Sequence, residues 1–273
     1  MVMSLFFAKL AVSILVVLGL SMLAERAGPR VAGVLSGYPL GTAILLFFIA
    51  IEQGVHFAGE SAVYALPGLI ATLAFLYAYY LISKWLLRHA VLVQVAGASL
   101  GAFATFVFVS WLGQMVRFTL LSASLSLVAA MIVAIVLFRA IENVSISQRV
   151  KITHKIVAMR AATAAMIVVA ISGAAAIIGP RWSGLFSGFP VTLYPMMLIL
   201  HWSYGVAPVH TVIRNFPRGM GALLIYIVSV SFTYPRFGIG EGTLLAFGAA
   251  TIYLVCYSSV VWWRSRETAQ AGQ

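Results

Sequence analysis

Long apolar runs separated by short polar segments form the main pattern in this chain of 273 residues. A helix needs about twenty consecutive apolar residues to cross a bilayer. The pattern predicts nine such helices, at residues 4–24, 31–52, 61–83, 90–112, 118–138, 157–178, 183–204, 219–234 and 240–263. We therefore expect an all-α polytopic membrane protein, in which the eighth span is the shortest.

Composition supports a membrane location. Hydrophobic residues make up 63% of the chain and charged residues 8%, whereas a soluble domain carries about 25% charged residues. The net charge of +11 is interpreted as a topology signal, and no nucleic-acid partner is expected. If the N-terminus lies outside, 13 of the 17 Lys and Arg residues fall on the opposite side. Because positive loops stay in the cytoplasm, we expect an inner (plasma) membrane protein with its N-terminus outside and its C-terminus in the cytoplasm.

An internal repeat organises the chain. Residues 28–39 read GPRVAGVLSGYP and residues 179–190 read GPRWSGLFSGFP, so seven of twelve positions are identical at an offset of 151. Spans 1–4 then correspond to spans 6–9, and the unpaired fifth span turns the second unit over. The sequence predicts a 4+1+4 inverted-topology repeat, an arrangement that many secondary transporters share.

Three segments follow from this repeat. Residues 1–112 form the first four-helix repeat, residues 113–156 form the connecting helix with a basic cytoplasmic linker, and residues 157–273 form the second four-helix repeat.

Each repeat resembles the GlpM family of small four-helix bacterial inner-membrane proteins. The resemblance rests on an early cation in the first helix, a small-residue step before an aromatic-Pro pair, and a glycine turn after the second helix. These features are Lys9 and Arg160, Tyr38-Pro39 and Phe189-Pro190, and Gly54 and Gly205, with Glu52 before Gly54 where the second repeat has Ser203. The resemblance implies an inner-membrane location and a link to cell-envelope polysaccharide.

The second helix of each repeat carries a predicted interruption. Proline removes a backbone donor and clashes with the preceding turn, and glycine weakens that turn further. Interrupted helices at corresponding positions of two halves mark the binding site of many transporters. The alternative is a kink that serves close helix packing. The candidate substrate-binding residues here are Ser36, Gly37, Tyr38, Pro39, Ser187, Gly188, Phe189 and Pro190.

Two pairs of cations are further candidates. Lys9 and Arg160 lie inside the first helix of each repeat, where a cation is costly and indicates function; they are predicted to contact a substrate anion. The alternative is that both side chains snorkel to the headgroups. Arg30 and Arg181 follow a Gly-Pro pair and either grip lipid headgroups or anchor the helix ends.

Few residues offer acid–base chemistry. Glu52, His56 and His201 are candidates for proton coupling, and the alternative for His201 is a hydrogen bond to a neighbouring helix. His210, like His89 and His154, is expected in a solvated cytoplasmic loop. Cys256 is the single cysteine, and the sequence has no Asp. We expect no metal, no cofactor and no enzymatic activity, because no acid pair or nucleophile–base spacing is visible.

The combined pattern favours a membrane transporter or lipid flippase for an anionic, amphipathic, lipid-phosphate-like substrate, working by alternating access at the repeat interface. The alternative is a non-transporting scaffold or subunit linked to envelope-polymer synthesis. The expected partners are membrane lipids and a small anionic or lipid substrate, and a second copy of the chain is a candidate partner.

Overall fold

The computed structural model describes residues 31–144 and 154–270, together with residues 11, 15 and 29. All regular secondary structure in these residues is helical. The helices are α2 (Leu40–Gln53), α3 (Val55–Trp85), α4 (Val91–Met115), α5 (Leu120–Phe138), α6 (His154–Ser187), α7 (Leu193–Tyr204) and α8 (Val206–Gln270).

Among the residues that the structure describes, five helical segments are long and apolar enough to cross a membrane. They are Val31–Gln53, Val55–Trp85, Val91–Met115, Leu120–Phe138 and Val206–Tyr257. The outer faces of α4 and α5 are also apolar, as lipid contact requires. Exposed large side chains on these two helices include Leu100, Phe103, Val107, Phe108, Leu121, Leu125, Ile132 and Val133. The chain is therefore a helical membrane protein.

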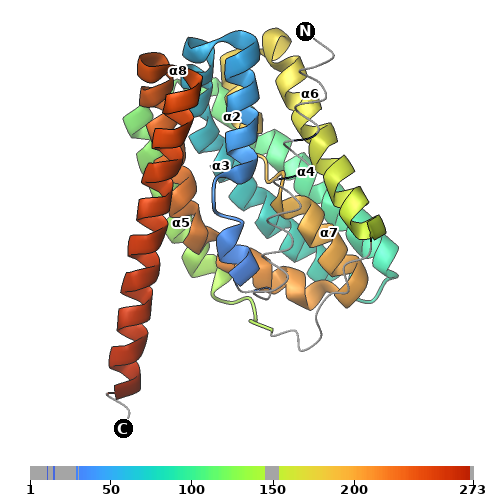
Figure 1. The fold of residues 1–273 in the computed structure, drawn as a ribbon. Coiled ribbons are helices and arrows are strands. Elements are labelled where there is room, and N and C mark those ends of the chain that lie inside the picture. The colour runs from blue at the N-terminus through green and yellow to red at the C-terminus, as the bar shows by residue number, and fades with distance from the viewer. Residues whose placement is uncertain (1–10, 12–14, 16–28, 30, 145–153, 271–273) are drawn as a thin grey trace.

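Two of the long helices are divided by glycines. Gly179 in α6 and Gly238 in α8 have φ angles of 76° and 75°, which residues with a side chain rarely adopt. Each glycine turns the chain sharply, so that α8 passes the core before Gly238 and returns along it afterwards (Figure 1).

The predicted loop before the eighth span is wrong. We expected a loop up to residue 218, but α8 begins at Val206 and already contains Arg214 and Arg218. The guanidinium groups of both residues bond within the protein. Arg214 donates to the carbonyl of Ile141, and Arg218 donates to Asn215 Oδ1 at 2.6 Å.

Helix α3 lies at the centre of the molecule. It packs against α2, α4, α5, α6 and α8, and its buried side chains include Leu66, Phe75 and Tyr79. Around it, α2 meets α3 at the top of Figure 1, whereas α7 meets α8 in the lower part of the view. Helices α2 and α7 therefore point in opposite directions.

Close backbone contacts occur in two corresponding pairs. A Cβ on Gly37 would overlap the backbone of Gly219, and a Cβ on Gly188 would overlap the backbone of Gly68. One pair becomes the other when each residue is exchanged for its counterpart at the offset of 151. Two further contacts correspond at the same offset: a Cβ on Gly33 would overlap the Val212 carbonyl, and a Cβ on Gly184 would overlap the Ser61 carbonyl.

Candidate functional site

The first predicted interruption is present. Residues 31–35 are helical, residues 36–39 form a turn, and α2 starts at Leu40. Pro39 has no N–H to donate, and the chain closes the turn with shorter-range bonds. The Tyr38 N–H donates to the Leu35 carbonyl at 2.9 Å, and the Leu40 N–H donates to the Tyr38 carbonyl at 2.8 Å.

The second interruption has the same hydrogen bonds. Helix α6 ends at Ser187 and α7 begins at Leu193. The Phe189 N–H donates to the Phe186 carbonyl at 3.0 Å, and the Val191 N–H donates to the Phe189 carbonyl at 2.8 Å. The Gly/Pro signal thus correctly predicted where both helices break.

The two interruptions share one small cavity of about 20 Å³. Five of the eight predicted interruption residues line it, namely Ser36, Tyr38, Gly188, Phe189 and Pro190. A single water needs roughly 10–15 Å³, so the space between the interruptions holds about one water in this conformation. Substrate-sized ligands require a wider opening.

Side-chain hydroxyls hold the interruptions in place. Ser36 and Ser187 bond back to carbonyls of their own turns, Ala32 at 2.8 Å and Gly184 at 2.7 Å. Thr72 on α3 reaches across and donates to the Gly188 carbonyl at 2.6 Å. This bond fastens the second interruption to the central helix.

The glycine turns after α2 and α7 also correspond. Gly54 and Gly205 have φ angles of 92° and 78°. Each N–H donates to the carbonyl four residues earlier, at 3.0 Å in both cases. The half-buried Glu52 lies just before the first of these turns, and its coupling role stays a prediction.

The four predicted cations are described to different extents. Lys9 and Arg30 lie outside the described residues, and Arg160 lies in α6 without a described side chain. Arg181 is half-buried, with its guanidinium 5.5 Å from the ring centroid of Tyr64 on α3. This contact joins the part of α6 that follows Gly179 to the central helix.

His201 is buried in a chain of hydrogen bonds that joins three helices. Its Nδ1 lies 2.8 Å from the Tyr79 hydroxyl on α3, and its Nε2 lies 3.1 Å from Gln94 Oε1 on α4. The Gln94 amide nitrogen donates to the carbonyls of Leu87 and His89. Its oxygen therefore accepts, which assigns the ring proton to Nε2 and makes Nδ1 the acceptor of the Tyr79 proton. The predicted bond from His201 to a neighbouring helix is confirmed.

His210 does not lie in a solvated loop, and that prediction is wrong. It belongs to α8, where it is half-buried, and its Nε2 lies 2.9 Å from Ser83 Oγ on α3. Its ring packs edge-on against Tyr80, with the centroids 4.7 Å apart. The apolar pattern that continues from Val206 carries His210 into the helix.

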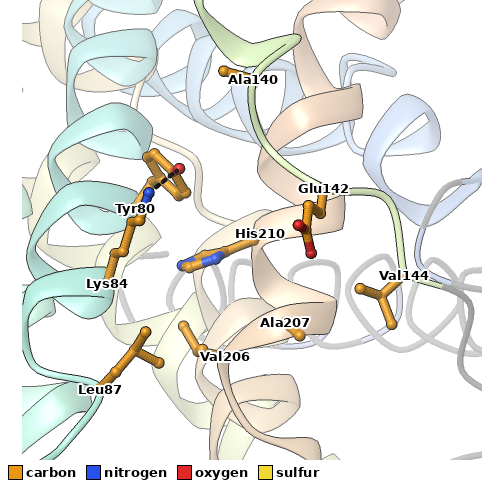
Figure 2. Close-up of a pocket in the computed structure, with 9 residues that line it drawn as sticks. All are labelled: Tyr80, Lys84, Leu87, Ala140, Glu142, Val144, Val206, Ala207 and His210. Carbon is orange, nitrogen blue, oxygen red and sulfur yellow. Dashed lines mark hydrogen bonds between the residues drawn. The ribbon is translucent and has the colours of Figure 1, made fainter.

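A larger cavity, of about 350 Å³, opens beside His210 (Figure 2). Sequence reasoning missed it, since its walls come from three distant segments. We call it the Lys84–Glu142 cavity; it is lined by Tyr80, Lys84, Leu87, Ala140, Glu142, Val144, Val206, Ala207 and His210.

The segment after α5 is fixed against α8. The Val144 N–H donates to Thr211 Oγ1 at 2.8 Å, and Asn215 Nδ2 donates to Asn143 Oδ1 at 3.0 Å. Arg214 donates to the Ile141 carbonyl. These bonds hold residues 139–144, the start of the predicted linker, in one position.

No family model, curated protein or solved structure matches this chain. The class of the protein therefore follows from the fold and the described site alone. It is a helical membrane protein with two interrupted helices that meet at its core.

Proposed function

We propose that the chain forms nine spans in a 4+1+4 inverted repeat. Dividing α6 at Gly179 and α8 at Gly238 supplies the additional spans. The corresponding contacts of Gly37 with Gly219 and of Gly188 with Gly68 support a two-fold relation between the halves. The opposite directions of α2 and α7 (Figure 1) support an axis in the membrane plane.

We further propose that the protein is a transporter or flippase for an anionic, amphipathic substrate. The observation that carries this proposal is that both interrupted helices line one cavity at the repeat interface. Interrupted helices leave backbone groups free to contact a substrate, and alternating access moves one repeat against the other around such a site. Lys9, Arg160, Arg30 and Arg181 are proposed to hold the anionic group at either end of the path.

One observation favours the alternative of a non-transporting scaffold. The cavity between the interruptions is only about 20 Å³, and the glycine contacts beside it are tight. A transporter with this structure must open that interface to pass a substrate, whereas a scaffold keeps it closed. The resemblance to the GlpM family stays a proposal as well, and it agrees with either role in the cell envelope.

Lipid movement in reconstituted vesicles tests the proposal. The full chain is inserted into phosphatidylcholine vesicles that contain a trace of fluorescent phosphatidylglycerol, and a membrane-impermeant reductant then bleaches the outer leaflet. In protein-free vesicles about half of the fluorescence is protected, because the inner leaflet is out of reach. A flippase is expected to lower this protected fraction.

The anionic preference is tested with fluorescent phosphatidylcholine in the same vesicles. Faster loss of protection for phosphatidylglycerol supports the proposed substrate class. Protection equal to that of empty vesicles for both lipids would reject the flippase and leave the scaffold as the better proposal.

A further inference from the structure

The Lys84–Glu142 cavity contains one cation and one anion that do not pair with each other. Lys84 Nζ donates to the Tyr80 hydroxyl at 3.4 Å, and the Glu142 carboxylate makes no ion pair with any described residue. Figure 2 shows the His210 ring projecting between them. Two opposite charges thus line one space of about 350 Å³, which is within the size range of small-molecule pockets.

The segments that carry the two charged groups are held in position by the fold. Lys84 lies one turn from Tyr80 on α3, and its Nζ is 5.6 Å from the Tyr80 ring centroid. Glu142 belongs to the segment that Thr211 and Arg214 fix to α8. A site whose polar groups are already in place loses less entropy on binding. The backbone around the cavity is therefore already ordered before a ligand binds.

The charges define what the cavity can hold. A ligand that is only anionic is attracted by Lys84 but repelled by Glu142, and a ligand that is only cationic meets the reverse. A molecule that carries an amine and an anionic group satisfies both side chains at once. Leu87, Val144 and Val206 provide apolar walls for the atoms between the two groups.

We propose that the Lys84–Glu142 cavity binds a small zwitterion, with its anionic group on Lys84 and its amine on Glu142. The same chemistry is found in a phosphatidylethanolamine headgroup and in a free water-soluble zwitterion. This site lies apart from the interrupted helices, so the inference does not depend on transport.

Binding to the purified full chain in detergent tests the proposal by calorimetry. The probes are phosphoethanolamine and its two halves, ethanolamine and methyl phosphate. We expect phosphoethanolamine to bind at least about tenfold more tightly than either half, because only the zwitterion engages both charges. Equal affinity for the zwitterion and one of its halves would overturn the proposal.

Charge-matched variants separate this site from general electrostatics. Lys84→Gln and Glu142→Gln are each expected to weaken phosphoethanolamine binding by about tenfold. Arg88→Gln and Glu60→Gln change the same charges at exposed positions outside the cavity, and they should leave the affinity unchanged. All four substitutions lie at exposed side chains, so thermal unfolding should match the unsubstituted protein. A cavity variant that folds normally and binds with unchanged affinity would contradict the assignment.

Competition identifies the source of the ligand. Nanodiscs of phosphatidylglycerol with or without phosphatidylethanolamine are compared in the same binding assay. If phosphatidylethanolamine displaces phosphoethanolamine, the site holds a lipid headgroup; if it does not, the site takes a soluble zwitterion. Either outcome supports the shared chemistry, whereas no binding of phosphoethanolamine in either nanodisc would overturn it.

Discussion

Gly37 lies so close to Gly219 that a Cβ on Gly37 would overlap the Gly219 backbone. The corresponding pair, Gly188 and Gly68, is packed in the same way. Small residues allow helices in a membrane to approach at backbone distance. Both interruptions are therefore pressed against a long helix, the first against α8 and the second against α3.

The glycine contacts predict a large effect of one added methyl group. Gly37→Ala and Gly188→Ala should each lower the free energy of unfolding by about 1–3 kcal/mol, because overpacking forces the backbones apart. Denaturant unfolding in detergent measures the change. Similar losses for both variants are expected, since the two contacts correspond.

Gly248→Ala provides the matched control for these variants. Gly248 lies in α8, and a methyl group added there would meet no atom within 4 Å. Alanine is favoured over glycine in a helix by about 1 kcal/mol, so this variant should be as stable as the unsubstituted protein or more stable. Equal stability of all three variants would argue against the tight contacts.

The Thr72 hydroxyl predicts a link between the central helix and the second interruption. Thr72→Val removes its bond to the Gly188 carbonyl and should lower the free energy of unfolding by about 1 kcal/mol. If the interruption moves during transport, the rate of lipid movement in vesicles should change too. Thr105→Val is the control, because Thr105 bonds only to Gly101 of its own helix. If both variants move lipid at the same rate, the Thr72 bond has no role in transport.

The hydrogen-bonded chain through His201 predicts coupling between three helices. His201→Leu leaves the Tyr79 hydroxyl and Gln94 Oε1 without this partner, and each buried unsatisfied group costs about 1–3 kcal/mol. Tyr79→Phe removes the hydroxyl that His201→Leu leaves unsatisfied. The stability lost in the double variant should therefore be smaller than the sum of the losses in the two single variants. A double-mutant cycle measured by unfolding checks this. Strict additivity would mean that the Tyr79–His201 bond contributes nothing.

Local signals explain what the sequence predicts well. The interruptions at Pro39 and Pro190 follow from residues within four positions of the break, and the Gly54 and Gly205 turns follow from the need for positive φ. Such features depend on the chain itself rather than on distant partners. Repetition at one offset strengthens each of them.

Long-range contacts explain what the sequence reasoning missed. Arg214 and Arg218 were interpreted as loop charges, but their partners lie on the α5–α6 segment and on α8 itself. The walls of the Lys84–Glu142 cavity come from three parts of the chain, and no spacing in the sequence brings Lys84 and Glu142 together. From the sequence, Lys84 contributes only to the count of positive charges that predicts topology, and Glu142 has no predicted role.

The expected orientation can be tested by cysteine labelling. With Cys256 replaced by serine, Glu60→Cys should react with an impermeant thiol reagent in intact cells, because residue 60 is predicted outside. Gln148→Cys should react only after permeabilisation, because the positive linker is predicted in the cytoplasm. The reverse pattern would invert the topology, and labelling of both sites from outside would change the predicted number of spans.

The final prediction concerns Lys9 and Arg160, the cations at corresponding positions of the two repeats. If they bind the substrate anion, Lys9→Ala and Arg160→Ala should each slow the movement of phosphatidylglycerol in vesicles. A cation inside a span is costly unless an anion is near, so neither variant should impair membrane insertion. Lys9→Arg keeps the charge and should be milder than Lys9→Glu.

The choice of lipid separates anion binding from snorkelling. If the cations contact a substrate phosphate with a net negative charge, the alanine variants should slow phosphatidylglycerol more than phosphatidylcholine, since a lost charge–charge attraction acts on the anionic lipid above all. Side chains that only reach the headgroups would leave both rates unchanged. Full activity of the double alanine variant would therefore remove Lys9 and Arg160 from the proposed path.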